Sequence, residues 1–262
     1  MSNDYDPTQG RYLLFLDILG FSELVKTRGQ AEVLGIITEA LQAFSRWENL
    51  NQSFRTIYFS DTFVFYQLPK GYGSWAFFDI YAIGGLVLTA LLAKGIAARG
   101  AITFGGFEVH DDMLGKHQVY FGPALIEAYQ AEQKEGWLGI TIQPSAWLPC
   151  EENDPGIIHA FEREKVWIKR SDDVLLLNPF IKLRSWYLDD LIGEVDTPYL
   201  EWDQPDFPNE IHAFKFLRGK GEFYASSGDF TGRVASKYHA TNAFLKQIFG
   251  PDLYAWACKI SE

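Results

Sequence analysis

The chain has 262 residues, of which 47% are hydrophobic and 16% aromatic, and a formal net charge of -11 at pH 7. This composition supports a sizeable core, and two cysteines, Cys150 and Cys258, are too few for a disulfide framework or a structural zinc site. The acidic balance argues against nucleic acid as a partner, since phosphate backbones are bound by clustered Lys and Arg, but it does not exclude a single nucleotide. The polar, acidic start is unlike a signal peptide, and we expect a cytoplasmic protein.

Hydrophobic periodicity and turn signals predict a series of elements along the chain. In chain order they are a strand at 11–17, helices at 20–28 and 30–48, a hairpin at 54–67, a helix at 75–96, a strand at 99–108, a helix at 122–133, strands at 138–148 and 157–169, a loop at 187–212 and a helix at 234–249. With the hairpin counted as two strands, the elements from 11 to 108 follow the order strand-helix-helix-strand-strand-helix-strand of a ferredoxin-like α+β sheet with additions.

We expect three regions in the chain. They are an N-terminal arm at 1–10, a core domain at 11–170, and an extension at 171–262 that packs on the core or at a dimer interface.

The longest apolar stretch, 75–98, has to be weighed as a membrane span. Its uninterrupted part, 80–93, is shorter than the roughly 20 residues that a span requires, and Asp79 and Lys94 bracket it. We therefore expect a buried core helix and no membrane association.

Two carboxylates interrupt apolar segments. Asp17 ends an apolar run that begins at Arg11, and Asp61 follows Ser60 at the expected turn of the hairpin. Burying an ionised carboxylate is costly unless it is paired or binds a metal. Either Asp alone is equally well explained as a cap for the next turn or helix, but the two together favour a shared site for Mg²⁺ or Mn²⁺.

Four segments resemble, in the right order, the motifs of class III nucleotidyl cyclases. Phe15-Leu-Asp-Ile-Leu-Gly-Phe-Ser22 is similar to the strand motif Phe-x-Asp-Ile-x-Gly-Phe-Thr, and Ser60-Asp61 lies where the family has Gly-Asp. Residues 99–106 are similar to Arg-x-Gly-x-x-x-Gly, and residues 121–132 follow Trp-Gly-x-x-Val-Asn-x-Ala-x-Arg-x-Glu. The resemblance covers residues 11–140 and implies the ferredoxin-like core of that family.

This resemblance implies a metal-dependent nucleotide site. Asp17 and Asp61 would hold two ions, Mn²⁺ or Mg²⁺, and the Ile18 carbonyl would complete the coordination. It also implies a homodimer in which one subunit supplies the metal carboxylates and the other the base and ribose contacts. Backbone N–H groups at the turn into the first helix would bind the phosphates: those of Leu19, Gly20, Phe21 and Ser22.

The base-reading positions depart from the family pattern. Purine-specific members have a Lys four residues before the second Asp and an Asp three residues before the Gly of the last motif, and here these positions hold Ile57 and Val119. Neither side chain can pair with a purine edge. The family's ribose Asn and transition-state Arg correspond to Ile126 and Gln130. Tyr58 is a candidate to bind or stack on a pyrimidine, and a core aromatic is the alternative.

Arg99 is our candidate for charge stabilisation in the transition state, because Gln130 supplies no cation. A salt bridge at the start of its strand is the alternative. Four further basic residues lie in a Gly-rich region that could reach a triphosphate, although such residues are commonly exposed: Arg218, Lys220, Arg233 and Lys237.

The combination resembles the pyrimidine cyclases of the Pycsar anti-phage systems. This implies conversion of UTP, ahead of CTP, to the 3′,5′-cyclic monophosphate and pyrophosphate, as a second messenger in bacterial antiviral defence. Two alternatives stay open: an inactive cyclase-like module that binds a nucleotide, and another metal-dependent phosphoryl-transfer enzyme on the same scaffold.

Overall fold

The structure, a computed structural model, describes residues 10–45, 54–67, 73–111, 118–153, 155–163, 165–181, 207–227 and 232–261. The strands are β1 (Arg11–Ile18), β2 (Phe54–Phe59), β3 (Thr62–Gln67), β4 (Ala98–Gly105), β5 (Glu108–Asp111), β6 (Gln118–Phe121), β7 (Gly139–Ile142), β8 (Trp167–Lys169) and β9 (Leu175–Leu177). The helices are α1 (Phe21–Arg28), α2 (Gln30–Ser45), α4 (Gly73–Ala93), α5 (Pro123–Lys134), α6 (Pro144–Asn153), α7 (Pro155–Arg163), α9 (Phe207–Ser227) and α10 (Arg233–Ile260).

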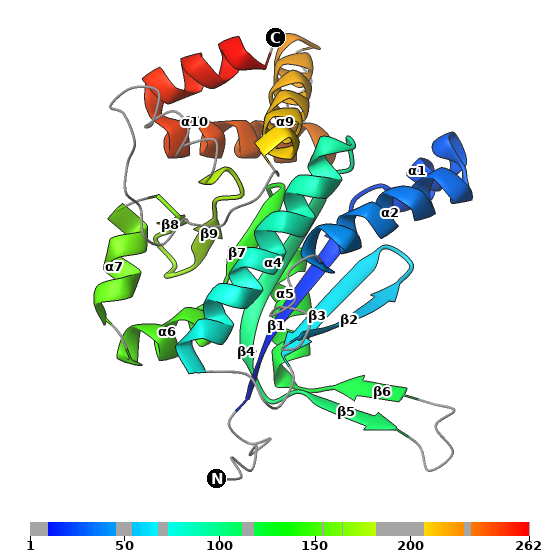
Figure 1. The fold of residues 1–262 in the computed structure, drawn as a ribbon. Helices are drawn as coiled ribbons and strands as arrows, with labels where there is room; N and C mark the ends of the chain where they lie inside the picture. The colour runs from blue at the N-terminus through cyan, green and yellow to red at the C-terminus, as the bar shows by residue number, and fades with distance from the viewer. Residues whose placement is uncertain are drawn as a thin grey trace.

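A seven-stranded sheet runs through the molecule in the order β2-β3-β1-β4-β7-β9-β8 (Figure 1). β1 lies between β3 and β4 and is antiparallel to both, while β4 and β7 are parallel. The order β2-β3-β1-β4, with helices between β1 and β2 and between β3 and β4, is the ferredoxin-like arrangement. The predicted α+β class is therefore confirmed. Because β9 pairs with β7, the sheet continues past residue 170.

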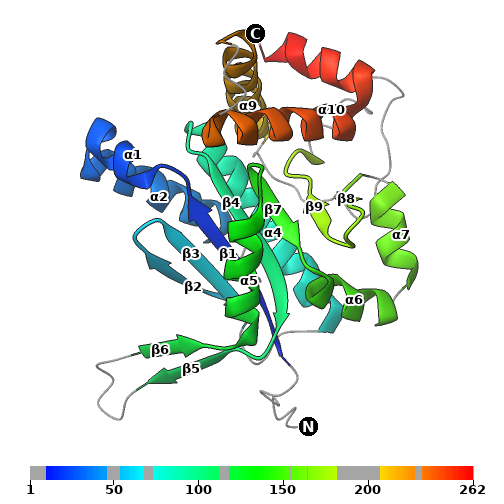
Figure 2. The ribbon, with the colours of Figure 1, turned by 180° about the vertical axis from the view of Figure 1, so that it is seen from behind.

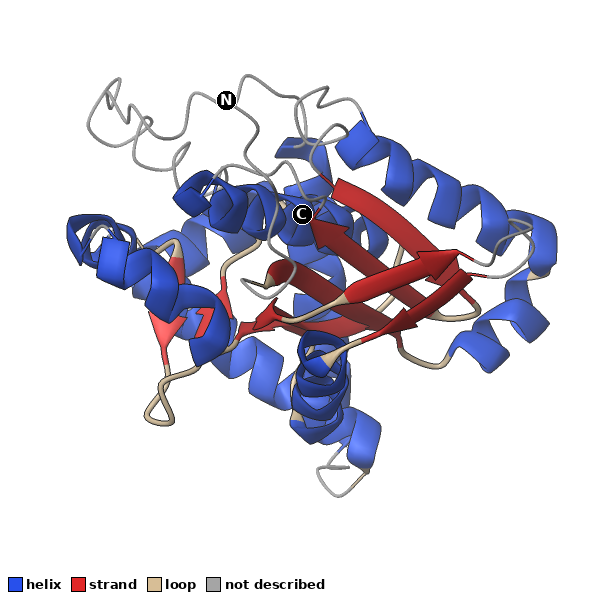
Figure 3. Cartoon of the chain, turned by 90° about the horizontal axis from the view of Figure 1, so that it is seen from below, coloured by secondary structure: helices blue, strands red, loops and turns tan. Residues whose placement is uncertain are grey.

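Helices cover both faces of this sheet (Figures 2 and 3). Alternation along β1 sends Leu14 and Leu16 into the large core formed with α2 and α4. Leu13 and Phe15 point to the other face, where they pack with buried alanines of α5. Asp17 follows the same alternation and lies on the α5 face.

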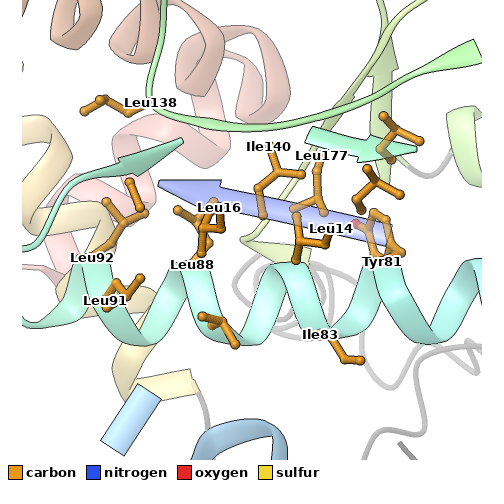
Figure 4. Close-up of a cluster of buried hydrophobic side chains, with 14 of the residues drawn as sticks. Leu14, Leu16, Tyr81, Ile83, Leu88, Leu91, Leu92, Leu138, Ile140 and Leu177 are labelled. Atoms are coloured by element: carbon orange, nitrogen blue, oxygen red, sulfur yellow. The ribbon is translucent and has the colours of Figure 1, made fainter. Parts of the chain in front are cut away.

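Helix α4 is the central core helix. Residues Ala76–Ala93 are apolar and long enough to cross a membrane, but 72% of this segment is buried inside the fold. Figure 4 shows Leu88 of α4 beside Leu16 of β1. The predicted buried helix is confirmed for this segment.

The C-terminal helices α9 and α10 pack above the end of the sheet, and α9 contacts α4 (Figure 1). The Phe214 ring lies 5.4 Å from the ring of Phe249, centroid to centroid. The loop expected at 187–212 is wrong from residue 207 onward, because α9 begins at Phe207 and buries Ala213, Phe214 and Leu217 at helical spacing. Residues 187–206 lie outside the described ranges.

Two expected strands are also corrected. The strand at 138–148 ends at Ile142, because Pro144 starts helix α6. The segment 157–169 is mostly helix α7, and only Trp167–Lys169 forms a strand. Short apolar runs of this kind do not separate a strand from one face of a helix by periodicity alone. Helix α2 ends at Ser45, and residues 46–48 are not described.

Candidate functional site

Asp17 belongs to a row of residues that crosses the sheet near the C-terminal end of β1. It is opposite Thr62 of β3 on one side and Arg99 of β4 on the other. Arg99 in turn is opposite Gly139 of β7. Directly opposite residues project from the same face of a sheet, so Asp17 and Arg99 both project on the α5 side.

Asp61 lies at the β2–β3 turn, and a backbone hydrogen bond fixes this turn against the end of β1. The Ile18 N–H donates to the Asp61 carbonyl at 2.8 Å. Ser60, just before Asp61, has a left-handed φ of 57°. The structure thus brings together the two aspartates that the sequence places 44 positions apart. Their role as metal ligands stays a prediction.

Negative charge accumulates around Asp17. Burial, followed by the carboxylates of Glu132 and Asp61, raises the pKa of the half-buried Asp17 to about 6, while Arg99 and Lys237 oppose the shift. Such a group of carboxylates suits a divalent cation, whose charge would relieve their repulsion. Across the described ranges, no cluster of three or more His, Cys, Asp or Glu is arranged to hold a metal. Two carboxylates, completed by substrate phosphates and water, suffice for Mg²⁺.

Arg99 forms a buried ion pair with Glu132 of α5. Its Nε contacts Glu132 Oε1, and the two side chains are 5% and 0% exposed. Arg99 Nη1 also donates to the Glu135 carbonyl at 3.0 Å, and Gln133 Nε2 donates to Glu132 Oε2 at 2.6 Å. This pair is the salt bridge that the sequence analysis kept as the alternative for Arg99. A charge-stabilising role for Arg99 stays a prediction.

A second ion pair continues this network toward the far edge of the sheet. The Arg170 guanidinium donates to both Glu135 carboxylate oxygens, at 2.9 and 3.0 Å. The same guanidinium binds Asp172, and these hydrogen bonds, with Asp172 as the largest cause, raise the pKa of Arg170. The Arg99 row is thereby connected to the turn between β8 and β9.

Glu132 had no role in the sequence analysis, although it ends the last resembling motif. Ala124, Ala128 and Glu132 follow one another at intervals of four, so they share one face of α5. The two alanines are buried against the sheet. This spacing was the signal that Glu132 points inward.

The turn into α1 contains a glycine in the left-handed region. Gly20, the N-cap of α1, has φ 70° and ψ 26°, a left-handed conformation that favours glycine. The first N–H groups of a helix have no partner within it, which leaves those of Gly20, Phe21 and Ser22 directed at the turn. The Leu19 N–H differs, because it donates to the Ala97 carbonyl at 2.9 Å. Leu19 is therefore excluded from the predicted phosphate-binding amides, and those of Gly20, Phe21 and Ser22 are kept.

Ile57 and Tyr58 lie on opposite faces of the sheet. Ile57 is opposite Val64 and packs on the α5 side. Tyr58 contacts the ring of Phe63 at 4.8 Å between centroids, and burial, followed by the Asp61 charge, raises its pKa. It lines a mostly apolar cleft of about 280 Å³ between α1, α2 and the β2–β3 hairpin. The two residues do not share one pocket within a subunit.

The other predicted base and ribose residues are exposed on β6 and α5. Val119 is 55% exposed, Ile126 is 58% exposed, and Gln130 is also exposed. Phe121 and Tyr129 on the same two elements are 49% and 52% exposed. We call Val119, Phe121, Ile126 and Tyr129 the β6–α5 surface. The Tyr129 ring lies 5.8 Å from the ring of Phe15, two residues before Asp17.

The C-terminal basic residues have different surroundings. Lys237 of α10 is only 7% exposed, and its charge opposes the rise in the pKa of both Asp17 and Glu132 that burial causes. Arg218 donates to the Cys258 carbonyl at 3.1 Å, and Lys220 is exposed. Nothing is described of the Arg233 side chain. Lys220 fits the alternative of an exposed surface charge, whereas Lys237, one of the four residues considered for a triphosphate, is buried and its charge acts on Asp17.

Solved structures that are similar to the chain are adenylyl and guanylyl cyclase domains. They include the adenylyl cyclase CyaB from P. aeruginosa, at 15% identity and a TM-score of 0.44 over 55% of this chain and 81% of that one. The dimeric guanylyl cyclase domain of the RhoGC fusion protein from Blastocladiella emersonii has 12% identity and a TM-score of 0.46, over 55% and 84% of the two chains. For an adenylate cyclase from Trypanosoma brucei in its monomeric state the identity is 13% and the TM-score 0.46, over 66% and 89%.

No protein-family model matches the chain, and no curated protein matches it in sequence. The similarity to the solved structures concerns the fold, and no residue of this chain is assigned a role from it.

Proposed function

We propose that the protein is a metal-dependent nucleotidyl cyclase. The observation that carries this proposal is the juxtaposition of Asp17 and Asp61 at the end of the sheet, beside the left-handed Gly20 turn into α1. A pair of carboxylates next to free helix amides is suited to a metal-bound triphosphate. The order of motifs from residue 15 to 132 supports the same reading.

In this proposal each residue has a defined task. Asp17 and Asp61 hold Mg²⁺ or Mn²⁺, which when bound supplies Lewis-acid activation of the ribose 3′-hydroxyl and the α-phosphorus. The amides of Gly20, Phe21 and Ser22 orient the triphosphate. The 3′-oxygen forms a bond to the α-phosphorus, the bond from that phosphorus to the bridging oxygen breaks, and pyrophosphate leaves while the hydroxyl proton passes to solvent. No protein nucleophile takes part.

The test is to incubate the purified protein with each of the four nucleoside triphosphates and Mg²⁺ or Mn²⁺, then resolve the products by chromatography. A cyclic monophosphate and an equal amount of pyrophosphate are expected, and Asp17→Asn and Asp61→Asn should give neither. Unchanged triphosphate that nevertheless binds would indicate the inactive nucleotide-binding module. Linear monophosphates or oligomers would indicate another phosphoryl-transfer enzyme.

We further propose that the substrate is a pyrimidine triphosphate, UTP ahead of CTP. Ile57 and Val119 offer no hydrogen bonds to a purine edge, and unpaired polar edges in a closed site typically cost about 1–3 kcal/mol each. A preference of about tenfold or more over ATP and GTP follows, since about 1.4 kcal/mol is a factor of ten. Competition among the four triphosphates measures it, and Ile57→Lys/Val119→Asp should raise purine turnover. Equal turnover of ATP or GTP by the wild type would refute the assignment.

We propose that the active species is a homodimer. The β6–α5 surface supports this, because four large apolar side chains exposed on adjoining elements are typical of an interface. Val119, Ile126 and Gln130 are also open to the contacts that a second subunit would need. Sedimentation compared with activity at matched concentrations tests it, and a fully active monomer would contradict it. The role in antiviral defence rests on the resemblance to the Pycsar cyclases alone.

A further inference from the structure

Helix α10 docks beside the Gly139 end of the row that contains Asp17. Thr241 of α10 accepts a hydrogen bond from the Leu138 N–H at 2.8 Å, and the Phe244 ring lies 4.5 Å from that of Trp137. Residues 137 and 138 immediately precede Gly139, the β7 member of the row. Figure 2 shows α10 crossing the end of the sheet beyond β4 and β7. The helix is therefore fixed against the sheet at the level of the site.

Lys237 lies one helical turn before Thr241 on the same face of α10. The Thr241 hydroxyl donates to the Lys237 carbonyl at 2.8 Å, which is the spacing of residues four apart in a helix. This places Lys237 on the face of α10 that meets the sheet, and its side chain is only 7% exposed. Lysine is seldom buried to this extent without charged partners.

The charges around Lys237 show what it faces. Its positive charge acts on both Asp17 and Glu132. Glu132 already has a cation at contact distance in Arg99. Asp17 therefore lies within reach of the positive charge of Lys237 as well as that of Arg99, whose contacting carboxylate is Glu132.

We propose that Lys237 is a phosphate-binding residue of the nucleotide site, delivered by the C-terminal helix of the same subunit that supplies Asp17. This inference rests on the proposed cyclase function. The ammonium group of lysine is a compact point charge that binds phosphate oxygens. The extension is then part of the active site.

The first experiment compares Lys237→Met, Lys237→Arg and the control Lys246→Met. Lys246 lies on the same helix, but it is exposed and stacks on Tyr254. We expect Lys237→Met to raise KM for the triphosphate, and the Kd for inorganic tripolyphosphate, by about tenfold or more, as loss of a charge-assisted hydrogen bond does. Lys237→Arg should recover part of this loss, and Lys246→Met should match the wild type.

A thermal unfolding scan of each variant separates a binding defect from misfolding. If Lys237→Met is folded and binds tripolyphosphate as the wild type does, the inference is wrong, even if kcat falls. If Lys237→Met does not fold, Lys237→Gln replaces it as the variant without the charge. A folded Lys237→Gln protein that keeps the wild-type KM and binds tripolyphosphate as tightly as the wild type would equally refute the inference. A wild type that cyclises no triphosphate would instead overturn the proposed function itself.

A second experiment tests whether Lys237 serves the site of its own chain. Subunits carrying Asp17→Ala are mixed with subunits carrying Lys237→Met. In the mixed dimer one site then lacks Asp17 and the other lacks Lys237, so activity should stay at the level of the Lys237→Met protein alone. Recovery toward half of the wild-type activity would show that Lys237 acts across the interface, which contradicts the proposal.

Discussion

Replacing Arg99 alone should destabilise the protein far more than replacing Arg99 and Glu132 together. The two side chains are 5% and 0% exposed, so Arg99→Met leaves the Glu132 carboxylate buried beside Gln133 without its contacting cation. Removing one partner of a buried pair costs about 3–5 kcal/mol, and the lost hydrogen bond to the Glu135 carbonyl adds about 1 kcal/mol. The double variant Arg99→Met/Glu132→Leu removes both charges and should lie within about 2 kcal/mol of the wild type.

Equilibrium unfolding in urea, followed by circular dichroism at pH 7.5 with EDTA present, gives the free energy of unfolding for the wild type, both single variants and the double variant. Lys94 and Glu39 provide the control pair, since their side chains are 45% and 58% exposed. Replacing that pair in the same way should change stability by less than about 1 kcal/mol.

Equal stability of Arg99→Met and the double variant would refute the reasoning, because it would mean that Glu132 carries no uncompensated charge. The double variant also tests the catalytic prediction for Arg99. If it is folded and still cyclises nucleotide at the wild-type rate, Arg99 is a structural residue. If it is folded and inactive, the positive charge of Arg99 is needed at the site.

Three further outcomes are expected. Asp17→Asn and Asp61→Asn should abolish cyclisation without lowering the thermal unfolding midpoint, because neutralising one carboxylate relieves repulsion; activity in both variants would remove the proposed metal site. Burial raises the pKa of Asp79 from 3.8 to about 6. The contribution of the protonated side chain to the stability of the fold is therefore complete below pH 3.8 and is lost as the pH rises through 6. Asp79→Asn should therefore stabilise the protein by up to about 3 kcal/mol at pH 7.5 and by little at pH 3.5, and equal effects at both pH values in urea unfolding would contradict the shift. Gly20→Ala should cost about 1–2 kcal/mol through its left-handed φ alone, since no atom lies within 4 Å of the added methyl, and should weaken triphosphate binding; unchanged stability would show that the turn tolerates another conformation.

The first half of the chain was predictable because its signals are local and strong. The alternation around Asp17, the hairpin turn at Ser60 and the apolar length of α4 each determine one element. The ferredoxin-like order follows from the sequence of these elements. The second half gave weaker signals: Pro144 starts a helix inside a segment that was expected to continue as a strand, and α7 has apolar residues that also fit a strand.

The candidate site was predictable to the same extent. Asp17 and Asp61 stand out because a carboxylate in an apolar strand is costly, and this cost is visible in one segment at a time. The partners that define their surroundings are not local. Glu132 reaches the site only because α5 packs its alanine face on β1 and β4, and Lys237 only because Thr241 docks α10 on the start of β7. The spacing of Ala124, Ala128 and Glu132 shows which face of α5 points inward, but no local pattern shows which strands that face meets.

The two proposed ligands differ in mechanical stiffness. Asp17 lies in the central strand β1, which pairs with β3 on one side and with β4 on the other. Asp61 belongs to a short turn that is joined to β1 by the Ile18 hydrogen bond. A change in ionic radius, as between Mg²⁺ and the larger Mn²⁺, would therefore be absorbed by a shift of the turn while the sheet stays in place. The β2–β3 hairpin would therefore adapt the site to the size of the ion, while β1 keeps Asp17 in a constant position.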